Sequence, residues 1–67
     1  MVVLITKYYD DKKTYKIVEG NEAEQYKKEG LISSTDECDV YVDLFETKKE
    51  LLDKRDAYID EEATEEA

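Results

Sequence analysis

Hydrophobic residues at the start of the chain follow the two-residue alternation of β-strands rather than a helical period. The segment 2–9 is rich in β-branched and aromatic residues, and its first half is apolar on both alternating faces. Such a run is typical of a strand in the middle of a sheet. The polar residues 10–13 predict a turn, after which residues 14–18 alternate again with Tyr15 and Ile17 on one face. The pattern therefore predicts a hairpin whose first strand is central.

A helix start signal follows the hairpin. Asn21 and Glu24 resemble an N-cap residue and its partner at N3, which predicts a short helix from about residue 22 to 29. Ala23 and Tyr26 would face inward on this helix.

The next segment predicts a helix end, a loop and a third strand. Gly30 is placed to end the helix in the left-handed conformation, and Leu31 and Ile32 are then expected to dock on the core. Residues 33–37 are all polar and predict a loop. Residues 40–45 alternate again and predict a strand, whose aliphatic face consists of Val40, Val42 and Leu44.

The clearest capping box in the chain opens a second helix. The Thr47 hydroxyl can accept from the amide at N3, where Glu50 can reach back to the start of the helix. We expect this helix to run to residues 60–62, with consecutive acidic residues weakening its end and residues 63–67 frayed. Its inward stripe would consist of Leu51, Leu52, Arg55, Tyr58 and Ile59.

These elements predict an α+β domain over residues 1–62 with β-β-α-β-α order. A right-handed crossover makes the second and third strands parallel, and the first strand fits between them, which gives a three-stranded mixed sheet of order 2-1-3. The long C-terminal helix would pack on one face. The other face would be left for a second subunit, and its candidate dimer residues are Tyr9, Tyr15 and Ile17.

Charge divides the chain into two unlike halves. Residues 1–32 hold six lysines and six acidic residues, whereas residues 33–67 hold 13 acidic residues against four cations, which accounts for the whole net charge of −9. An acidic surface of this kind repels nucleic acid and anionic membranes and attracts basic proteins. The candidate partner-binding residues are Asp39, Asp43, Glu46, Glu50, Asp53, Asp56, Asp60 and Glu61.

The spacing of four of these acidic residues predicts a regular row of charges. On a continuous helix, Glu50, Asp53, Asp56 and Asp60 would form a row with a carboxylate every ~5 to 6 Å, roughly like backbone phosphates. In size, charge and this row, the chain resembles the small acidic inhibitors made by bacteriophages, such as uracil-DNA glycosylase inhibitors and anti-restriction proteins that imitate DNA. The resemblance implies a host-directed inhibitor that occupies the nucleic-acid-binding surface of a histone-like nucleoid protein, a polymerase or a nuclease. The alternative is a structural or adaptor module that dimerises through its sheet face, with acidity serving solubility.

Catalysis is not expected, and no cofactor is indicated. The chain has no histidine, the usual general base near neutral pH, and the charges of Glu37 and Asp39 work against a nucleophilic thiolate at Cys38. The carboxylates at residues 36–43 could attract a divalent cation, but they lack the glycine-containing spacing of a calcium loop, so a solvated loop is favoured over a metal site.

Direct nucleic-acid binding by the hairpin is not expected. Lysines and tyrosines interleave over residues 7–16, as in some nucleic-acid-binding surfaces, but the net charge opposes direct binding.

The N-terminal residues and the cysteine content indicate where the protein is located. The apolar run 2–5 is too short for a membrane span or a signal-peptide core, and a lone Cys38 fits a reducing compartment. We therefore expect a cytoplasmic protein, in the bacterial host cytoplasm if it is phage-encoded.

Overall fold

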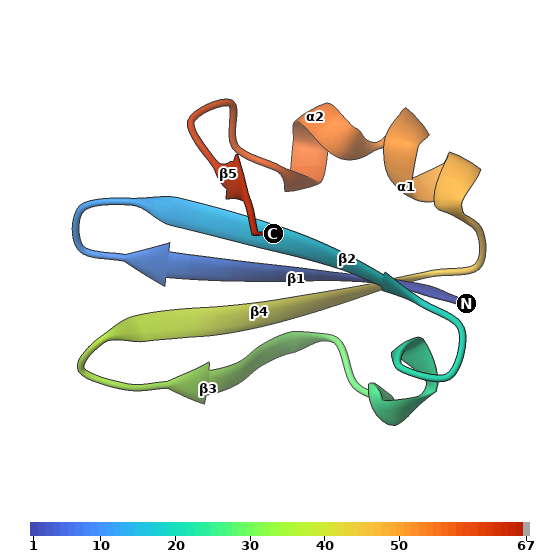
Figure 1. Ribbon diagram of the computed structural model, residues 1–67, viewed down its shortest axis with the longest axis horizontal. Coiled ribbons are helices and arrows are strands. Elements are labelled where there is room, and N and C mark those ends of the chain that lie inside the picture. Colours follow the sequence, from blue (N-terminus) through green and yellow to red (C-terminus); the bar gives the residue numbers. More distant parts are fainter. Residues whose placement is uncertain (67) are drawn as a thin grey trace.

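One five-stranded sheet of order β3-β4-β1-β2-β5 organises the protein in a computed structural model that describes residues 1–66 (Figure 1). β1 pairs antiparallel with both β2 and β4, β3 pairs antiparallel with β4, and β5 pairs parallel with β2. The elements in chain order are β1 (Val2–Tyr9), β2 (Lys13–Glu19), the 3-10 turn η1 (Ala23–Gln25), β3 (Gly30–Ser34), β4 (Cys38–Phe45), α1 (Lys48–Asp53), α2 (Arg55–Tyr58) and β5 (Thr64–Glu65).

The predicted hairpin and the central position of its first strand are confirmed. β1 runs along β2 from the Val2–Glu19 pair to the Tyr8–Lys13 pair, and β4 lies on its other side. The residues of β1 from Val2 to Thr6 are all buried, because layers of chain cover both faces of the sheet at this end.

Each face of the sheet carries its own core cluster. On the face covered by α1 and α2, which we call the helix face, the cluster comprises Val2, Leu4, Tyr15, Phe45, Leu51 and Ile59. On the opposite face, the cluster comprises Val3, Ile5, Val18, Ala23 and Val42, with Tyr26 packed against it. Successive side chains of a strand point to opposite faces, so the mixed apolar run of β1 supplies both clusters.

The predicted fold class is wrong. The protein is a mostly β domain with five strands and short helices, not a three-stranded α+β domain with a long C-terminal helix. The predicted 2-1-3 arrangement survives only as the inner β2-β1-β4 part of the sheet. Two strands were missed, and both expected helices are shorter than predicted.

The expected helix over residues 22–29 is reduced to the single turn η1, and Asn21 does not cap it. This segment must carry the chain from β2 past β1 and β4 to the far edge, a distance of about 14 Å at the normal strand spacing. Extended backbone covers about 3.3 Å per residue against 1.5 Å in a helix, so the extended form is favoured after η1. Gly30 does have a positive φ of 102°, but it begins β3 instead of ending a helix.

Leu31 and Ile32 were expected to dock on the core, and this prediction is also wrong. They lie in the edge strand β3 and are 53% and 48% exposed. The predicted polar loop at 33–37 is confirmed only in its second part, because Ser33 and Ser34 belong to β3.

The C-terminal helix begins where the sequence predicts but is interrupted. Thr47 caps α1 by accepting a hydrogen bond from the Glu50 amide at 3.2 Å. Lys54 then leaves the helical conformation, with φ −103° and ψ 8°, before α2 starts. Leu51 and Ile59, eight positions apart on the predicted stripe, still join one core cluster, whereas Leu52 and Tyr58 of that stripe are exposed.

Residues 63–67 were expected to be frayed, but Thr64–Glu65 form β5 beside Thr14 and Tyr15 of β2. The Glu66 amide donates to the Tyr15 carbonyl at 2.8 Å, and Ala63 packs against the helix-face cluster. Ala67 lies outside the described residues.

Candidate functional site

Part of the helix face along β3 and β4 is left accessible, because Leu31 and Tyr41 are exposed and Asp39 and Asp43 are half-buried. The paired residues of antiparallel strands point to the same face, so Asp39, Tyr41 and Asp43 share the helix face with Phe45. Of these, only Phe45 joins the core cluster beneath the helices. We call the remaining surface the open strip, and it consists of Tyr8, Leu31, Asp39, Tyr41 and Asp43.

Two tyrosines form the aromatic part of the open strip. The rings of Tyr8 and Tyr41 meet edge to face, with centroids 5.4 Å apart and planes at 89°. Together with Asp39 they line a shallow hollow. The ring edges and faces in this hollow remain accessible, since Tyr41 is 37% exposed.

Asp39 is held in position by a neighbour on β3. The Ser34 hydroxyl donates to the Asp39 carboxylate at 2.6 Å. A hydrogen bond to one carboxylate oxygen restricts the rotation of the side chain while leaving other lone pairs free. Asp39 is therefore oriented beside the two tyrosines and can still accept from a partner.

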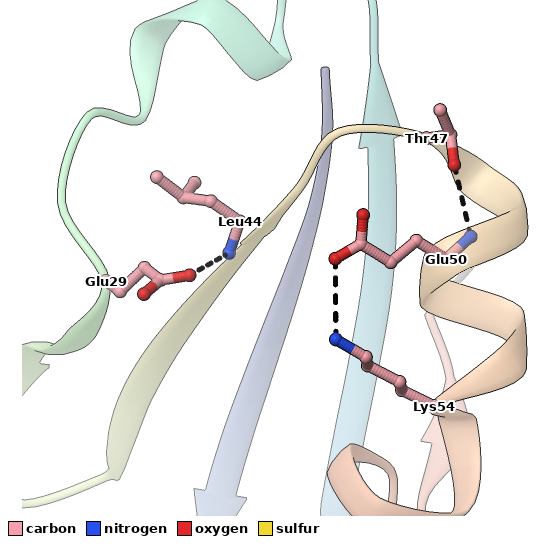
Figure 2. Close-up of polar contacts among 5 residues, drawn as sticks. All are labelled: Glu29, Leu44, Thr47, Glu50 and Lys54. Carbon is pink, nitrogen blue, oxygen red and sulfur yellow. Dashed lines mark hydrogen bonds and ion pairs between the residues drawn. The ribbon is translucent and has the colours of Figure 1, made fainter.

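Asp43 lies in a less favourable environment for a charge. It pairs across the sheet with Leu4, which is fully buried, and burial raises the pKa of the Asp43 carboxyl. The negative charge of Glu29 raises that pKa further. Glu29 directly precedes the last β3–β4 pair, and its carboxylate accepts from the Leu44 amide at 3.0 Å (Figure 2). The charged form of Asp43 is thus maintained at a cost to the fold.

The predicted row of carboxylates is not assembled on one helix. Glu46 lies between β4 and α1, Glu50 and Asp53 lie on α1, and Asp56 lies on α2 after the interruption. Glu50 is engaged by Lys54 at 3.5 Å, and the two side chains face each other along α1 (Figure 2). A phosphate-like pitch along a rigid rod is therefore absent from this part of the chain.

Two acidic residues near the C-terminus are paired with lysines of the hairpin. Lys13 and Asp60 are 2.6 Å apart, and their hydrogen bond and mutual attraction lower the pKa of the Asp60 carboxyl and raise the pKa of Lys13. Lys7 and Glu66 lie 3.4 Å apart. Glu61, the next residue after Asp60, is exposed. These pairs fasten the C-terminal segment to the hairpin, so Asp60 acts in the fold rather than as a free anion.

The three residues expected to form a dimer face do not form one. Tyr15 is only 7% exposed in the helix-face cluster, and Ile17 packs against the same cluster. The Tyr15 hydroxyl accepts from the Arg55 guanidinium at 3.2 Å, which joins α2 to β2. Tyr9 pairs with Cys38 on the opposite face of the sheet, where the Lys12 ammonium lies 4.9 Å from its ring centroid.

The carboxylates of residues 36–43 do not converge on a common point. Within residues 1–66, no group of three or more potential metal-ligating side chains is arranged to hold an ion. In the same part of the chain, no helix is long and apolar enough to cross a membrane.

The sequence prediction found both acids of the open strip but missed Tyr8, Leu31 and Tyr41. Their role depends on which half of the sheet the helices leave uncovered, which no local pattern reports. The turn between β3 and β4 did carry a signal. Thr35 accepts from the amides of Glu37 and Cys38, a motif in which threonine favours a tight turn between two strands.

Comparison of the chain with protein-family models, curated proteins and solved structures gives no match.

Proposed function

We propose that this is a non-enzymatic acidic binding protein that occupies the nucleic-acid-binding surface of a basic partner protein. The observation that carries the proposal is the open strip, where the exposed Tyr41 lies between Asp39 and Asp43 on β4 and beside the half-buried Tyr8. Carboxylates beside aromatic rings offer a basic protein the two chemical features that nucleic acid offers it, namely anions and flat π surfaces.

A lysine or arginine of the partner can use both features at once. Its cationic group can lie against the ring of Tyr41 or Tyr8 while it donates to the carboxylate of Asp39 or Asp43. Such a contact also relieves the unfavourable position of Asp43, because a nearby cation favours the charged carboxylate. The cost of keeping that charge in the free protein is consistent with a binding role.

The remaining carboxylates contribute through the field of the whole molecule. Glu46, Asp53 and Asp56 are exposed and add to the net charge of −9, which attracts a cationic partner over long range. Rim charges of this kind mainly change the association rate, whereas charges in close contact change the dissociation rate. The open strip therefore provides the contact, and the negative charge of the whole molecule provides steering.

The phage-inhibitor resemblance and a cytoplasmic location in a bacterial host belong to this proposal. The contact surface in this proposal is the open strip, whose acidic and aromatic residues lie on β1 and β4, and not a helical row of acids.

Affinity capture from a bacterial lysate at low salt, with a salt step to release bound proteins, provides the partner for the test. The released partner should bind DNA, and the acidic protein should compete with DNA for it, with affinity falling steeply as salt rises. A captured partner whose DNA affinity is unchanged by saturating acidic protein would contradict the proposed mode of action.

Two double variants of equal charge locate the contact. Asp39→Asn with Asp43→Asn should speed dissociation of the captured partner at least about tenfold, as expected when close charge pairs are lost. Asp53→Asn with Asp56→Asn removes the same amount of charge from the helices and should mainly slow association. Equal effects of the two variants on dissociation would instead favour an adaptor whose acidity serves only solubility.

A further inference from the structure

Strand β3 forms one edge of the sheet and, within residues 1–66, has neither charged side chains nor a covering segment to protect it. Natural edge strands are commonly blunted by charged side chains or covered by other chain segments. At the other edge, β2 carries the exposed charges Lys16 and Glu19, and β5 covers part of it. The sequence of β3 is Gly30–Ser34 and holds no charged residue.

The side chains of β3 are also unusually apolar for exposed positions. Leu31 and Ile32 are 53% and 48% exposed. The register between β3 and β4 shifts between Leu31 and Ser33, where Ile32 forms an irregularity in the ladder. A bulge of this kind twists an edge but leaves the backbone groups on either side of it free to pair.

Charges of opposite sign flank this strand. Lys27 and Lys28 lie just before β3, and Asp36 and Glu37 lie in the turn just after it. All four side chains are exposed, and none of them forms an ion pair within residues 1–66. Glu29 also precedes β3, so Lys27 and Lys28 give that end of the free edge a net positive charge of one, while the other end carries two negative charges.

We propose that a second copy of this chain pairs with β3 along this edge, antiparallel and about a two-fold axis, so that the sheet continues from one copy into the other. In this orientation the Lys27–Lys28 end of each copy lies beside the Asp36–Glu37 end of the other, and each contact is made twice. A parallel arrangement would place like charges together. Leu31 and Ile32 of the two copies become neighbours across the new pairing, which removes apolar surface from water.

The net charge of −9 on each copy opposes association, but its reach is limited. At physiological ionic strength the Debye length is about 8 Å, so only charges close to the new pairing act at nearly full strength. Those are the complementary flanking groups. Because antiparallel strands of one sheet keep the same face, the open strips of both copies lie on one side of the extended sheet and approach each other at Leu31 of the two β3 strands.

The test is sedimentation equilibrium of the intact protein at physiological salt over a wide concentration range. Wild-type protein should show a reversible monomer–dimer equilibrium. K27E/K28E places acids beside acids, and D36K/E37K places lysines beside lysines, so each variant alone should dimerise at least about tenfold more weakly, or about 1.4 kcal/mol. Far-UV circular dichroism and thermal unfolding of each variant establish that it is folded.

Mixing the two variants in equal amounts provides the decisive control. The K27E/K28E chain and the D36K/E37K chain complement each other at both ends of the edge, so the mixture should regain dimers that contain one copy of each. General attraction cannot cause this result, because each double swap moves the net charge of −9 by only four units and both variants stay negative. A mixture that remains monomeric, a wild-type protein that stays monomeric throughout, or swap variants that dimerise as wild type does would each overturn the proposal.

Leu31 belongs to both surfaces, but the carboxylates of the open strip are not part of the proposed pairing. Asp39→Asn with Asp43→Asn should leave the monomer–dimer equilibrium unchanged within about threefold, since both residues lie on β4 and an amide oxygen in place of the Asp39 carboxylate can still accept from Ser34. The two proposals can therefore fail independently.

Discussion

Adjacent leucines on α1 allow a direct test of how the helix is seated on the sheet. Leu51 is 1% exposed and belongs to the helix-face cluster, whereas Leu52 is 49% exposed. The apolar stripe in the sequence includes both residues and does not distinguish them. The structure assigns them opposite roles, so the same substitution at both sites should give very different results.

The expected magnitudes follow from burial. Leu51→Ala removes methyl and methylene groups from a packed cluster and leaves a cavity, which costs about 2 to 5 kcal/mol. Leu52→Ala leaves no cavity, and because half of its side chain already contacts water, the loss should stay below about 1 kcal/mol. At roughly 0.05 to 0.15 kcal/mol per residue, a 67-residue domain has a free energy of unfolding of roughly 3 to 10 kcal/mol. Leu51→Ala should therefore remove a large share of the total stability.

Urea unfolding followed by circular dichroism, with tyrosine fluorescence as a second probe, measures the difference, and six tyrosines make the second signal adequate. In thermal unfolding, each 1 kcal/mol lowers the Tm of a domain this size by about 4 to 8 °C, so the two variants should be well separated. Equal losses at the two positions, or a greater loss at Leu52, would refute the seating of α1 described above.

Three further predictions concern the cap, the ion pair and the core. Thr47→Ala removes the hydroxyl that accepts from the Glu50 amide and should lower the free energy of unfolding by about 1 kcal/mol, whereas Thr47→Ser should restore most of the loss in the same urea assay. Lys13→Met should raise the pKa of Asp60 toward its ordinary value in an NMR titration, while Lys12→Met, which removes a lysine lying over the Tyr9 ring, should not. The folded-state pKa of Asp60 is lowered and that of Lys13 is raised, so the pair stabilises the fold at pH values above the ordinary carboxyl range. This stabilisation is lost as the pH falls through the lowered pKa of Asp60 or rises through the raised pKa of Lys13. The free energies of unfolding of Lys13→Met and of the wild type should therefore converge in acid. Thr6 is 2% exposed, and its hydroxyl has no hydrogen-bond partner among residues 1–66. Thr6→Val should therefore increase the free energy of unfolding by up to about 1 kcal/mol. A decrease in the free energy of unfolding would instead show that the hydroxyl is hydrogen-bonded.

Local patterns correctly predicted the elements that are determined locally. The β-branched and aromatic run of β1, the alternation of β2 and β4 and the Thr47 cap all appear in the structure, because strand propensity, alternation and capping depend on residues only a few positions apart. The continuous apolar run of β1 also identified the central strand, since only such a strand is covered on both faces.

Elements that depend on the whole fold were not predictable in this way. β3 contains only two large apolar residues, and it forms because the β4 edge is available beside it. β5 has two residues and exists through its pairing with β2. The interruption at Lys54 divides the predicted helix, and of its apolar stripe only Leu51 and Ile59 are buried in the core cluster, which depends on where the helices meet the sheet.

The candidate site shows the same division. The sequence analysis named Asp39 and Asp43 for the charge they add from the third strand, and both lie on the helix face of β4. The helical row from Glu50 to Asp60 was overestimated. The Glu50–Lys54 pair is a local i,i+4 contact, whereas the Lys13–Asp60 pair and the interruption at Lys54 depend on the rest of the fold. Tyr41 was missed because its exposure depends on which part of the sheet the helices cover.

An NMR footprint of the isotope-labelled protein with its captured basic partner shows directly whether the open strip is the contact surface. The largest chemical-shift changes should fall on the open strip, at Tyr8, Leu31, Asp39, Tyr41 and Asp43. The pKa of Asp43 should fall on binding, because a cation of the partner then lies beside it. Shifts confined to α1 and α2, with the Asp43 pKa unchanged, would contradict the open strip as the contact surface.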